Sequence, residues 1–437
     1  MKEFLKKIVI TILTLEARVV LRTYKPKIVA ITGSVGKTST KDAIFSVLAK
    51  TTHVRKSEKS YNSEIGLPLT ILGLQNAWGN PLRWMQNIFD GLLLIVMRGT
   101  YPEWLVLEIG ADRPGDIRSL VNWLKVDIAV ITRLPETPVH VEFFDSPEAV
   151  VEEKAALIEC IRPGGTLLLY ADDPHTRALE RHEPFPDARV LLFGFNADAD
   201  VRASDFALVR AQPVGRKKGM PVGMRATITV EGESAPVEIA GTVGTHSFLS
   251  GVAAAAVGHT LGLPLQTILE GLAGYEPPPG RMRLLRGVKQ SLIIDDTYNS
   301  SPAAVEAALE TLTLINPKRA IVVLGDMLEL GRHSVDAHRK AGAQAAKVCD
   351  LLVTIGFRAR DIAQGALDNR LRDEKIFQYE DARKAGADLK NWVGEGDVVL
   401  VKGSQSMRME RVVEELMLEP ERARELLVRQ DAEWKRR

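Results

Sequence analysis

The segment Ile31-Thr-Gly-Ser-Val-Gly-Lys-Thr38 holds the residue types that bind nucleotide phosphates. Gly33 and Gly36 would let the backbone curl so that its N–H groups point at phosphate oxygens. Lys37 supplies a mobile positive charge, and Thr38 offers a hydroxyl that can bind Mg²⁺. The segment predicts a site for a nucleoside triphosphate. The competing interpretation is a chance Gly-Lys-Thr in a loop, and the neighbouring elements decide between the two.

A buried strand is expected at 27–32, directly before this loop, and a helix at 37–50, directly after it. The helix N-terminus would then face the bound anion, which favours the phosphate-binding interpretation. Further strand-like runs occur at 104–109, 127–132 and 165–170, and a helical pattern occurs at 146–161. This alternation predicts an α/β fold with a mostly parallel sheet covered by helices.

The second half of the chain repeats this alternation after a change of pattern. Short alternating strands between 203 and 239 predict an antiparallel extension of the first sheet. The stiff segment Pro277-Pro-Pro-Gly280 is the best domain boundary. Beyond it, strands are expected near 291–295, 320–324, 350–355 and 397–401, with helices near 302–314, 335–347, 381–391 and 405–416. This predicts a second, doubly wound α/β domain.

The predicted organisation has four parts: an N-terminal helix at 1–26, a central nucleotide-binding domain at 27–276, a second domain at 277–418 and a charged helical tail at 419–437. Within the central domain, residues 75–103 form an apolar segment that resembles an insertion. It and the N-terminal helix either pack against each other or form a membrane-facing patch. The apolar run at 8–15 is well short of the roughly 20 residues that span a bilayer.

Composition narrows the classes of protein. Hydrophobic residues make up 45% and charged residues 26%, so a disordered chain is excluded. The net charge of +1 gives no electrostatic reason to expect nucleic acid. Two cysteines without metal-ligand spacing, Cys160 and Cys349, predict a reduced cytoplasmic protein, either free in the cytoplasm or at the inner face of the membrane.

Several motifs together resemble the Mur ligase family, in that family's order. They are the loop at 32–39, Asn62-Ser-Glu-Ile-Gly-Leu-Pro-Leu69, Glu108-Ile-Gly-Ala-Asp112, His140-Val-Glu-Phe-Phe144, Asp295-Asp-Thr-Tyr-Asn-Ser-Ser-Pro302, Leu324-Gly-Asp-Met-Leu-Glu-Leu-Gly331 and Val401-Lys-Gly-Ser404. The last three are similar to the branch that adds D-alanyl-D-alanine. The resemblance covers roughly residues 27–415 and implies an ATP-dependent amide ligase of peptidoglycan synthesis that works through an acyl-phosphate.

The resemblance also implies roles for individual residues. Nucleotide contacts are expected from Gly33, Ser34, Gly36, Lys37, Thr38, Ser39, Arg281, Asp296 and Asn299. One Mg²⁺ would be held by Thr38 and Glu108, and a second would lie near His140. Lys154 matches a lysine that is often carbamylated and then serves the second metal, whereas a solvated helix lysine is the alternative. Lys402 matches a position that faces the acyl-phosphate, so Lys37, His140, Lys154 and Lys402 are the expected catalytic residues.

Three departures from the family pattern bear on the substrate. The nucleotide loop begins near residue 31, so the domain that holds the uridine-diphosphate end of the substrate in the D-alanyl-D-alanine branch is expected to be absent. The muramoyl peptide that supplies the carboxylate could therefore be linked either to a nucleotide or to a lipid. The apolar segment at 75–103 is the second departure. The third is Thr245-His-Ser-Phe-Leu-Ser250, which has serines where asparagines are usual.

Two alternatives remain beside D-alanyl-D-alanine addition. One is a relative that extends folate or a polypeptide with amino acids. The other is a nucleotide-dependent, membrane-associated scaffold without catalysis, which predicts the loss of metal-binding and carbamate-forming groups. Thr38, Glu108, His140 and Lys154 are all present, which favours the enzyme.

Overall fold

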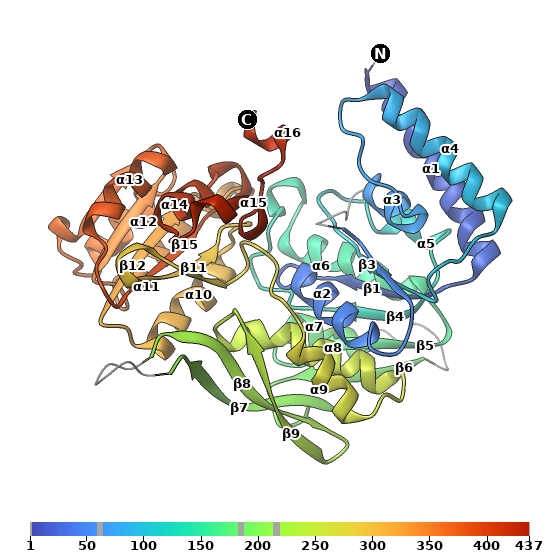
Figure 1. The fold of residues 1–437 in the computed structure, drawn as a ribbon, viewed down its shortest axis with the longest axis horizontal. Helices are drawn as coiled ribbons and strands as arrows, with labels where there is room; N and C mark the ends of the chain where they lie inside the picture. Colours follow the sequence, from blue (N-terminus) through green and yellow to red (C-terminus); the bar gives the residue numbers. More distant parts are fainter. Residues whose placement is uncertain (1, 59–63, 182–187, 213–218, 437) are drawn as a thin grey trace.

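Two β-sheets, each covered by helices, form the body of the protein (Figure 1). The structure is a computed structural model that describes residues 2–58, 64–181, 188–212 and 219–436. The central sheet has nine strands in the order β2-β3-β1-β4-β5-β6-β7-β8-β9, and the C-terminal sheet has six in the order β10-β11-β15-β12-β13-β14. The fold is α/β, as the sequence predicts.

The central sheet is parallel from β2 to β7 and antiparallel from β7 to β9. Its strands are β1 (Lys27–Thr32), β2 (Val54–Lys56), β3 (Trp104–Glu108), β4 (Val126–Ile131), β5 (Ile161–Tyr170), β6 (Arg189–Gly194), β7 (Val201–Arg210), β8 (Pro221–Val230) and β9 (Glu233–Ala240). The antiparallel extension expected between 203 and 239 is confirmed. The sequence did not predict strands β2 and β6, which the structure contains.

Alternate side chains of β1 point to opposite faces of this sheet. Val29 and Ile31 belong to the core that α2 (Lys37–Leu48), α8 (Phe248–Thr260) and α9 (Leu265–Ala273) cover. Ile28 and Ala30 belong to the core on the other face. Because both faces are covered, the strand is apolar throughout and ends with its carboxyl edge at the phosphate-binding loop.

The second face carries α1 (Lys2–Tyr24) and the shorter helices of the first half of the chain. These are α3 (Gly66–Leu72), α4 (Pro81–Met97), α5 (Arg118–Val121), α6 (Pro147–Ala155) and α7 (Pro174–Ala178). The helix expected at 146–161 is present as α6, followed by a 3-10 segment, Ala156–Cys160. Ser146 begins α6 by accepting a hydrogen bond from the Ala149 N–H.

The C-terminal sheet is parallel except for its edge strand β10, which runs antiparallel to β11. Its strands are β10 (Arg283–Arg286), β11 (Leu292–Asp296), β12 (Arg319–Gly325), β13 (Leu351–Ile355), β14 (Ile376–Tyr379) and β15 (Asp397–Lys402). Its helices are α10 (Pro302–Ile315), α11 (Ser334–Ala345), α12 (Arg360–Asp368), α13 (Ala382–Trp392) and α14 (Glu410–Leu416).

One sequence prediction in this half is wrong in detail. The helix expected at 405–416 is broken, because Arg408 adopts a left-handed conformation (φ 53°) between the 3-10 turn Gln405–Met407 and α14. The charged tail, expected to be helical, forms short helical segments within its described residues, Pro420–Arg422, α15 (Ala423–Leu426) and α16 (Ala432–Lys435). Arg429 at φ 57° interrupts it, because its side chain is held by the body of the protein.

One hydrophobic core is shared by the two sheets. It runs from Val29 of β1 through Val243 and Met282 to Ile294 of β11 and Leu309 of α10. The sheets are also joined by main-chain hydrogen bonds, including Leu284 N–H to the Gly241 carbonyl at 2.9 Å. Pro277 lies in the connection between them, where the sequence predicts a domain boundary; that division of the chain stays a prediction.

Helices α1 and α4 lie side by side and extend to one edge of the molecule (Figure 1). Trp84, Ile88 and Ile95 of α4 pack on the same core as Leu13 and Ala17 of α1. The predicted packing of the 75–103 segment on the N-terminal helix is therefore confirmed for the inner faces. No helix within the described ranges has the length and apolar content needed to cross a bilayer.

The contact between α1 and α4 buries a carboxyl group, that of Glu16. Its side chain is 4% exposed, and neither oxygen has a hydrogen-bond partner among the described residues. A Cβ added to Gly91 would lie 2.2 Å from Oε2 of Glu16, so a larger residue there would displace this carboxyl group. Burial raises the pKa of Glu16 from 4.5 to about 7.

Glu16→Gln is expected to change the pH dependence of stability. The raised pKa means that the folded protein binds more protons than the unfolded chain between pH 4.5 and 7, so the wild type loses stability as pH rises through this window. At pH 8 the variant should have a free energy of unfolding higher by on the order of 2 kcal/mol, and below about pH 4.5 the two should agree. Urea unfolding across pH 4–8.5 measures this, with the exposed Glu103→Gln as control. A difference that does not vary with pH contradicts the assignment.

Candidate active site

The phosphate-binding loop sits at the carboxyl end of β1 and leads into α2. Gly33 has φ 138°, and a Cβ there would lie 2.0 Å from Oγ1 of Thr132, so no other residue fits without moving β4. Gly36 adopts φ 87° as the N-cap of α2, and no side chain caps the helix. The first N–H groups of α2 are therefore oriented toward the loop, where an anion is stabilised.

Two lysines hold the loop from opposite sides. Lys37 Nζ donates to the Gly33 carbonyl at 2.8 Å. Lys154 of α6 is 2% exposed, and its Nζ contacts the same carbonyl at 3.3 Å and Oγ of Ser34 at 2.9 Å. Burial lowers the pKa of Lys37 and lowers the pKa of Lys154 well below its ordinary value, and the Lys37 ammonium lowers the pKa of Lys154 further. Lys154 is not a solvated helix lysine.

A single hydroxyl joins the loop to the C-terminal half. Thr38 Oγ1 donates to Oε2 of Glu108, at the end of β3, over 2.8 Å. Nη2 of Arg281 donates to the same hydroxyl oxygen over 2.7 Å. The sequence-predicted approach of Arg281 to the nucleotide loop is thus present in this structure.

Arg281 is held in place by Asp295 and Asp296, the last two residues of β11, and by Tyr298, which follows the strand. Its guanidinium lies 4.0 Å from the centroid of the Tyr298 ring, a cation–π contact. The backbone on either side is fixed because Gly280 N–H donates to Asp295 and Met282 N–H donates to Asp296. Burial raises the pKa of Asp295 to about 6, against hydrogen bonds from Thr297 that lower it.

Six of the thirteen predicted site residues line a cavity of about 660 Å³, which we name the phosphate-side cavity. Its walls include Ser34, Lys37, Glu108, Asp112, His140, Arg281, Asn299 and Glu329. His140 has φ 71° and lies between two carboxylates, with Nδ1 2.6 Å from Glu329 and Nε2 3.4 Å from Asp112. The His140 contact lowers the pKa of Glu329. Central and C-terminal residues therefore meet at His140.

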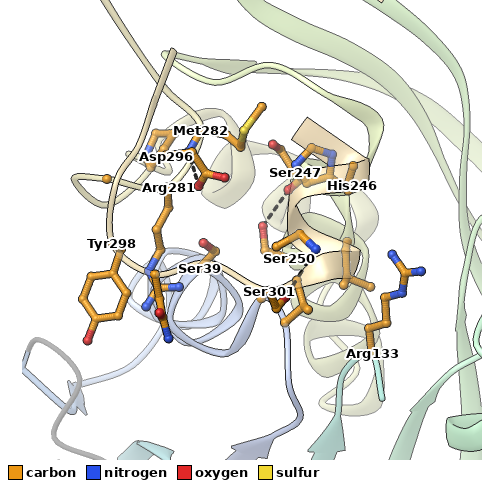
Figure 2. A pocket seen from close by; sticks show the side chains of 18 of the residues that line it. Ser39, Arg133, His246, Ser247, Ser250, Arg281, Met282, Asp296, Tyr298 and Ser301 are labelled. Carbon is orange, nitrogen blue, oxygen red and sulfur yellow. Dashed lines mark hydrogen bonds between the residues drawn. The ribbon is translucent and has the colours of Figure 1, made fainter. Parts of the chain in front are cut away.

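A second cavity of about 140 Å³, the inner cavity, lies on the other side of Arg281 (Figure 2). Ser39, His246, Ser250, Asp296 and Lys402 are among its lining residues. Burial lowers the pKa of His246 to about 4, so its ring is neutral at neutral pH and can both donate and accept a hydrogen bond. Oγ of Ser250 donates to the Ser247 carbonyl within the first turn of α8, where the family usually has an asparagine.

Lys402 occupies the end of β15 and is 2% exposed. Its Nζ lies 2.6 Å from Oδ2 of Asp296 and donates to the Asn299 carbonyl at 2.9 Å. It lines the inner cavity and is absent from the described lining of the phosphate-side cavity. Its expected position facing an acyl-phosphate stays a prediction.

A third cavity, of about 690 Å³, is lined in part by residues that the sequence analysis did not identify. We name it the tail cavity. Lys41, Lys56, Arg281, Arg429 and Trp434 are among its lining residues. Lys41 Nζ lies 3.9 Å from Glu108, and burial lowers its pKa. Its spacing of four residues from Lys37 puts both on one helix face, a signal that could have identified it. Arg429 and Trp434 had no such signal.

Arg429 connects the tail to the site. It is 8% exposed, pairs with Glu410 at 2.7 Å and donates to the carbonyls of Thr297 and Tyr298. Because Tyr298 stacks on Arg281, the tail supports the group that reaches Thr38.

The donor set around Thr38 suits a magnesium ion. A hydroxyl and a carboxylate oxygen lie in contact at a strand end, and Mg²⁺ takes one or two such protein oxygens together with phosphate oxygens and water. Arg281 stands where the cation would bind, so it would have to shift. In the part of the chain that the structure describes, no three or more His, Cys, Asp or Glu residues cluster as a metal site.

Two further polar residues of the C-terminal half, His338 and Asp326, are buried. Nε2 of His338 accepts from the Met327 N–H at 2.9 Å. Asp326 caps a neighbouring loop by accepting from the Ala359 N–H. Asn62, Ser63 and His182 lie outside the described residues.

The phosphate-binding loop lies at a strand end of the central sheet, and Arg281, which precedes the C-terminal sheet, contacts it. These features define a nucleotide-binding protein whose site lies between two sheets. Comparison with known families gives its place within that class. The Mur ligase middle domain matches residues 31–81 and 89–257, and the Mur ligase glutamate ligase domain matches residues 280–405. The chain belongs to the Mur ligase family.

Individual relatives agree with this assignment. The UDP-N-acetylmuramoyl-tripeptide--D-alanyl-D-alanine ligase of Bacillus subtilis is 27% identical over 406 residues, which are 92% of this chain and 79% of that protein. The MurF ligase of Thermotoga maritima, solved in complex with ADP, is 29% identical with a TM-score of 0.74, over 93% of this chain and 83% of that one. The folylpolyglutamate synthase of Mycobacterium tuberculosis, at 16% identity and a TM-score of 0.63 over 90% and 93% of the two chains, shares the fold.

The pair formed by Asp296 and Lys402 gives a prediction for stability. Asp296→Asn should lower the free energy of unfolding by about 3 kcal/mol, because it leaves a buried ammonium without its counter-charge. Adding Lys402→Met should recover most of the loss. Urea unfolding of both single variants and the double variant measures the coupling. The exposed pair Arg360–Glu380 is the control, and Glu380→Gln should change stability by less than about 0.5 kcal/mol. Additive effects at Asp296 and Lys402 would rule out the coupling.

Proposed function

We propose that this protein is an ATP-dependent amide ligase that joins D-alanyl-D-alanine to the carboxylate of a muramoyl peptide in peptidoglycan synthesis. The observation that carries the proposal is the shared hydroxyl of Thr38, which links the nucleotide loop, Glu108 and Arg281 within one site. Membership in the Mur ligase family supports the reaction class, and the names of the relatives support the amino substrate.

The first step transfers the γ-phosphoryl group of ATP. A carboxylate oxygen of the acyl substrate attacks the γ-phosphorus, the bond to the β-phosphate oxygen breaks, and ADP leaves. Lys37 and Arg281 line the phosphate-side cavity and neutralise the charge that spreads over the phosphoryl oxygens. Backbone N–H groups of the loop from Gly33 to Gly36 hold the phosphates in place.

Magnesium would be held by Thr38 and Glu108, with a second ion near His140. When bound, Mg²⁺ would offset the negative charge of the phosphate oxygens. Of the residues in the chain, Thr38 can supply a hydroxyl oxygen and Glu108 a carboxylate oxygen without rearrangement of the strands. Asp112 and Glu329 add carboxylate oxygens beside His140.

The second step forms the amide. The neutral amine of the dipeptide attacks the acyl carbon of the acyl-phosphate, inorganic phosphate leaves, and the nitrogen loses one proton. In this proposal Asp296, Asn299 and Lys402 shape the nucleotide-facing wall, since the three are joined by hydrogen bonds in the inner cavity. His140 and Glu329 lie where the two sheets meet and border the space left for the dipeptide.

Lys154 is proposed to be carbamylated. Its neutral amine would attack CO₂ to give a carbamate and release one proton, and the lowered pKa makes the neutral amine available at neutral pH. A carbamate would place a negative charge beside Lys37 and Ser34. This would offset the ammonium of Lys37 and supply an oxygen toward the phosphate-side cavity.

The carrier of the acyl group and the place of action complete the proposal. The relatives are named for a muramoyl tripeptide that is linked to a nucleotide, so we propose a nucleotide as the carrier. A lipid-linked muramoyl peptide is the alternative. Action at the inner face of the membrane is proposed from helices α1 and α4, whose outer faces carry apolar side chains.

Phosphate release tests the function. Purified protein with ATP and Mg²⁺ should release phosphate only when D-alanyl-D-alanine and a muramoyl tripeptide are both present, because the acyl-phosphate is consumed by the amine. Crossing amino acids and dipeptides with nucleotide-linked and lipid-linked acceptors identifies both substrates. Lys37→Ala should lower the rate by about a hundredfold or more, since it removes a charge that stabilises the transferring phosphoryl group. Release with L-glutamate and a folate, but not with the dipeptide, would refute the proposal.

Lys154 gives a separate prediction. Incubation with ¹³C-bicarbonate should produce one carbamate carbon signal in the ¹³C NMR spectrum, and Lys154→Ala should lack it. The variant should lose activity by about a hundredfold or more, with partial recovery on adding acetate, because a small carboxylate can restore the missing charge. Lys125→Ala, an exposed lysine, is the control. A wild type with full activity and no carbamate signal would contradict the carbamate.

A further inference from the structure

Helix α4 is apolar on two opposite faces. Its inner face packs on the core of the central sheet, through Trp84 and Ile88. Its outer face exposes a second apolar stripe at helical spacing, formed by Leu82, Met85, Phe89, Leu92 and Val96. Met85 is 67% exposed and Val96 is 76% exposed. A soluble surface helix would carry polar residues here, so this stripe calls for a partner.

Helix α1 carries a matching stripe. Leu5, Ile8, Leu15 and Val19 are exposed and recur at the spacing of one helix face. The buried side chains Leu13, Ala17 and Val20 of the same helix pack on the central sheet. Helices α1 and α4 lie side by side at one edge of the molecule (Figure 1), and each carries exposed apolar side chains.

A basic cavity of about 360 Å³ lies beside the α1 stripe. Arg18, Arg22, Lys25, Lys125 and Arg162 line it, together with Trp123 and Asn122. Among these five cations only Arg162 has an ion pair within the described residues, with Asp127 at 3.1 Å. A cavity with this excess of positive charge suits an anionic phosphate group.

We propose that the outer surface of α1 and α4 docks on an anionic lipid bilayer, with the basic cavity taking a lipid phosphate. Apolar stripes flanked by arginines are what an interfacial helix presents to the headgroup region. The basic cavity favours an anionic surface over a second copy of this chain, because Arg18, Arg22 and Lys25 line it without an ion pair among the described residues. This inference extends the membrane contact named above and does not depend on the ligase activity.

Vesicle co-sedimentation of the purified full chain tests the docking surface without catalysis. Wild type should bind vesicles of 70% phosphatidylcholine and 30% phosphatidylglycerol more tightly than vesicles of phosphatidylcholine alone. The triple variant Leu82→Gln/Phe89→Gln/Val96→Gln should reduce partitioning by about a hundredfold or more, because three apolar side chains lose their burial. The matched control Leu314→Gln/Val335→Gln/Phe357→Gln changes exposed apolar residues elsewhere and should bind as wild type does.

A charge variant separates the cavity from the stripe. Arg18→Gln/Arg22→Gln should weaken binding to the anionic vesicles by roughly tenfold or more and leave binding to neutral vesicles unchanged. Arg383→Gln/Lys390→Gln, two exposed cations on α13, is the matched control. Release of the protein from anionic vesicles by inorganic phosphate, but not by chloride of equal ionic strength, would show a free-phosphate site instead.

Three other results would overturn the proposal. These are no binding of the wild type to either vesicle, equal loss of binding in the stripe variant and its control, or a dimer in sedimentation velocity that the stripe variant dissociates. The last result would assign the surface to a second copy of the chain. If the wild type binds vesicles but releases no phosphate in the ligase assay, only the ligase proposal is contradicted.

Discussion

The hydroxyl of Thr38 is the point on which the arrangement of the site depends. It donates to Glu108 on one side and accepts from Arg281 on the other, so one oxygen fixes a helix of the nucleotide loop, a strand end and a residue 243 positions later in the chain. Arg281 in turn needs Tyr298, and Tyr298 is held by Arg429. A change at any member of this chain of contacts would be felt at the loop.

Three lysines lie close to the phosphate-binding loop. Lys41 and Lys154 are buried and Lys37 is half-buried, and desolvation lowers the pKa of each. A bound polyphosphate would supply negative charge beside them, which favours nucleotide binding. The same reasoning makes a carbamate at Lys154 favourable, because it would place a negative charge beside Lys37.

Much of this fold could be predicted because its elements have strong local patterns. β1 is apolar throughout and is followed by glycines whose conformations only glycine adopts, so the loop was evident from residues 27–38. Residues positioned by distant contacts were not predictable. Arg408 breaks a helix because its side chain reaches Glu410 and the Trp434 carbonyl. Arg429 enters the site through carbonyls about 130 residues away, and spacing in the sequence gives no sign of such a contact.

The contribution of Arg429 and Trp434 to the cavity walls also sets when the site can form during synthesis. The loop around Lys37 emerges early, whereas the segment that supports Tyr298 is made about 400 residues later. At a translation rate of roughly 5 to 20 residues per second, the two are separated by roughly 20 to 80 s. The contact through which Arg429 supports Tyr298 can form only after the tail has been made, so the complete wall around Arg281 is the last part of the site to assemble.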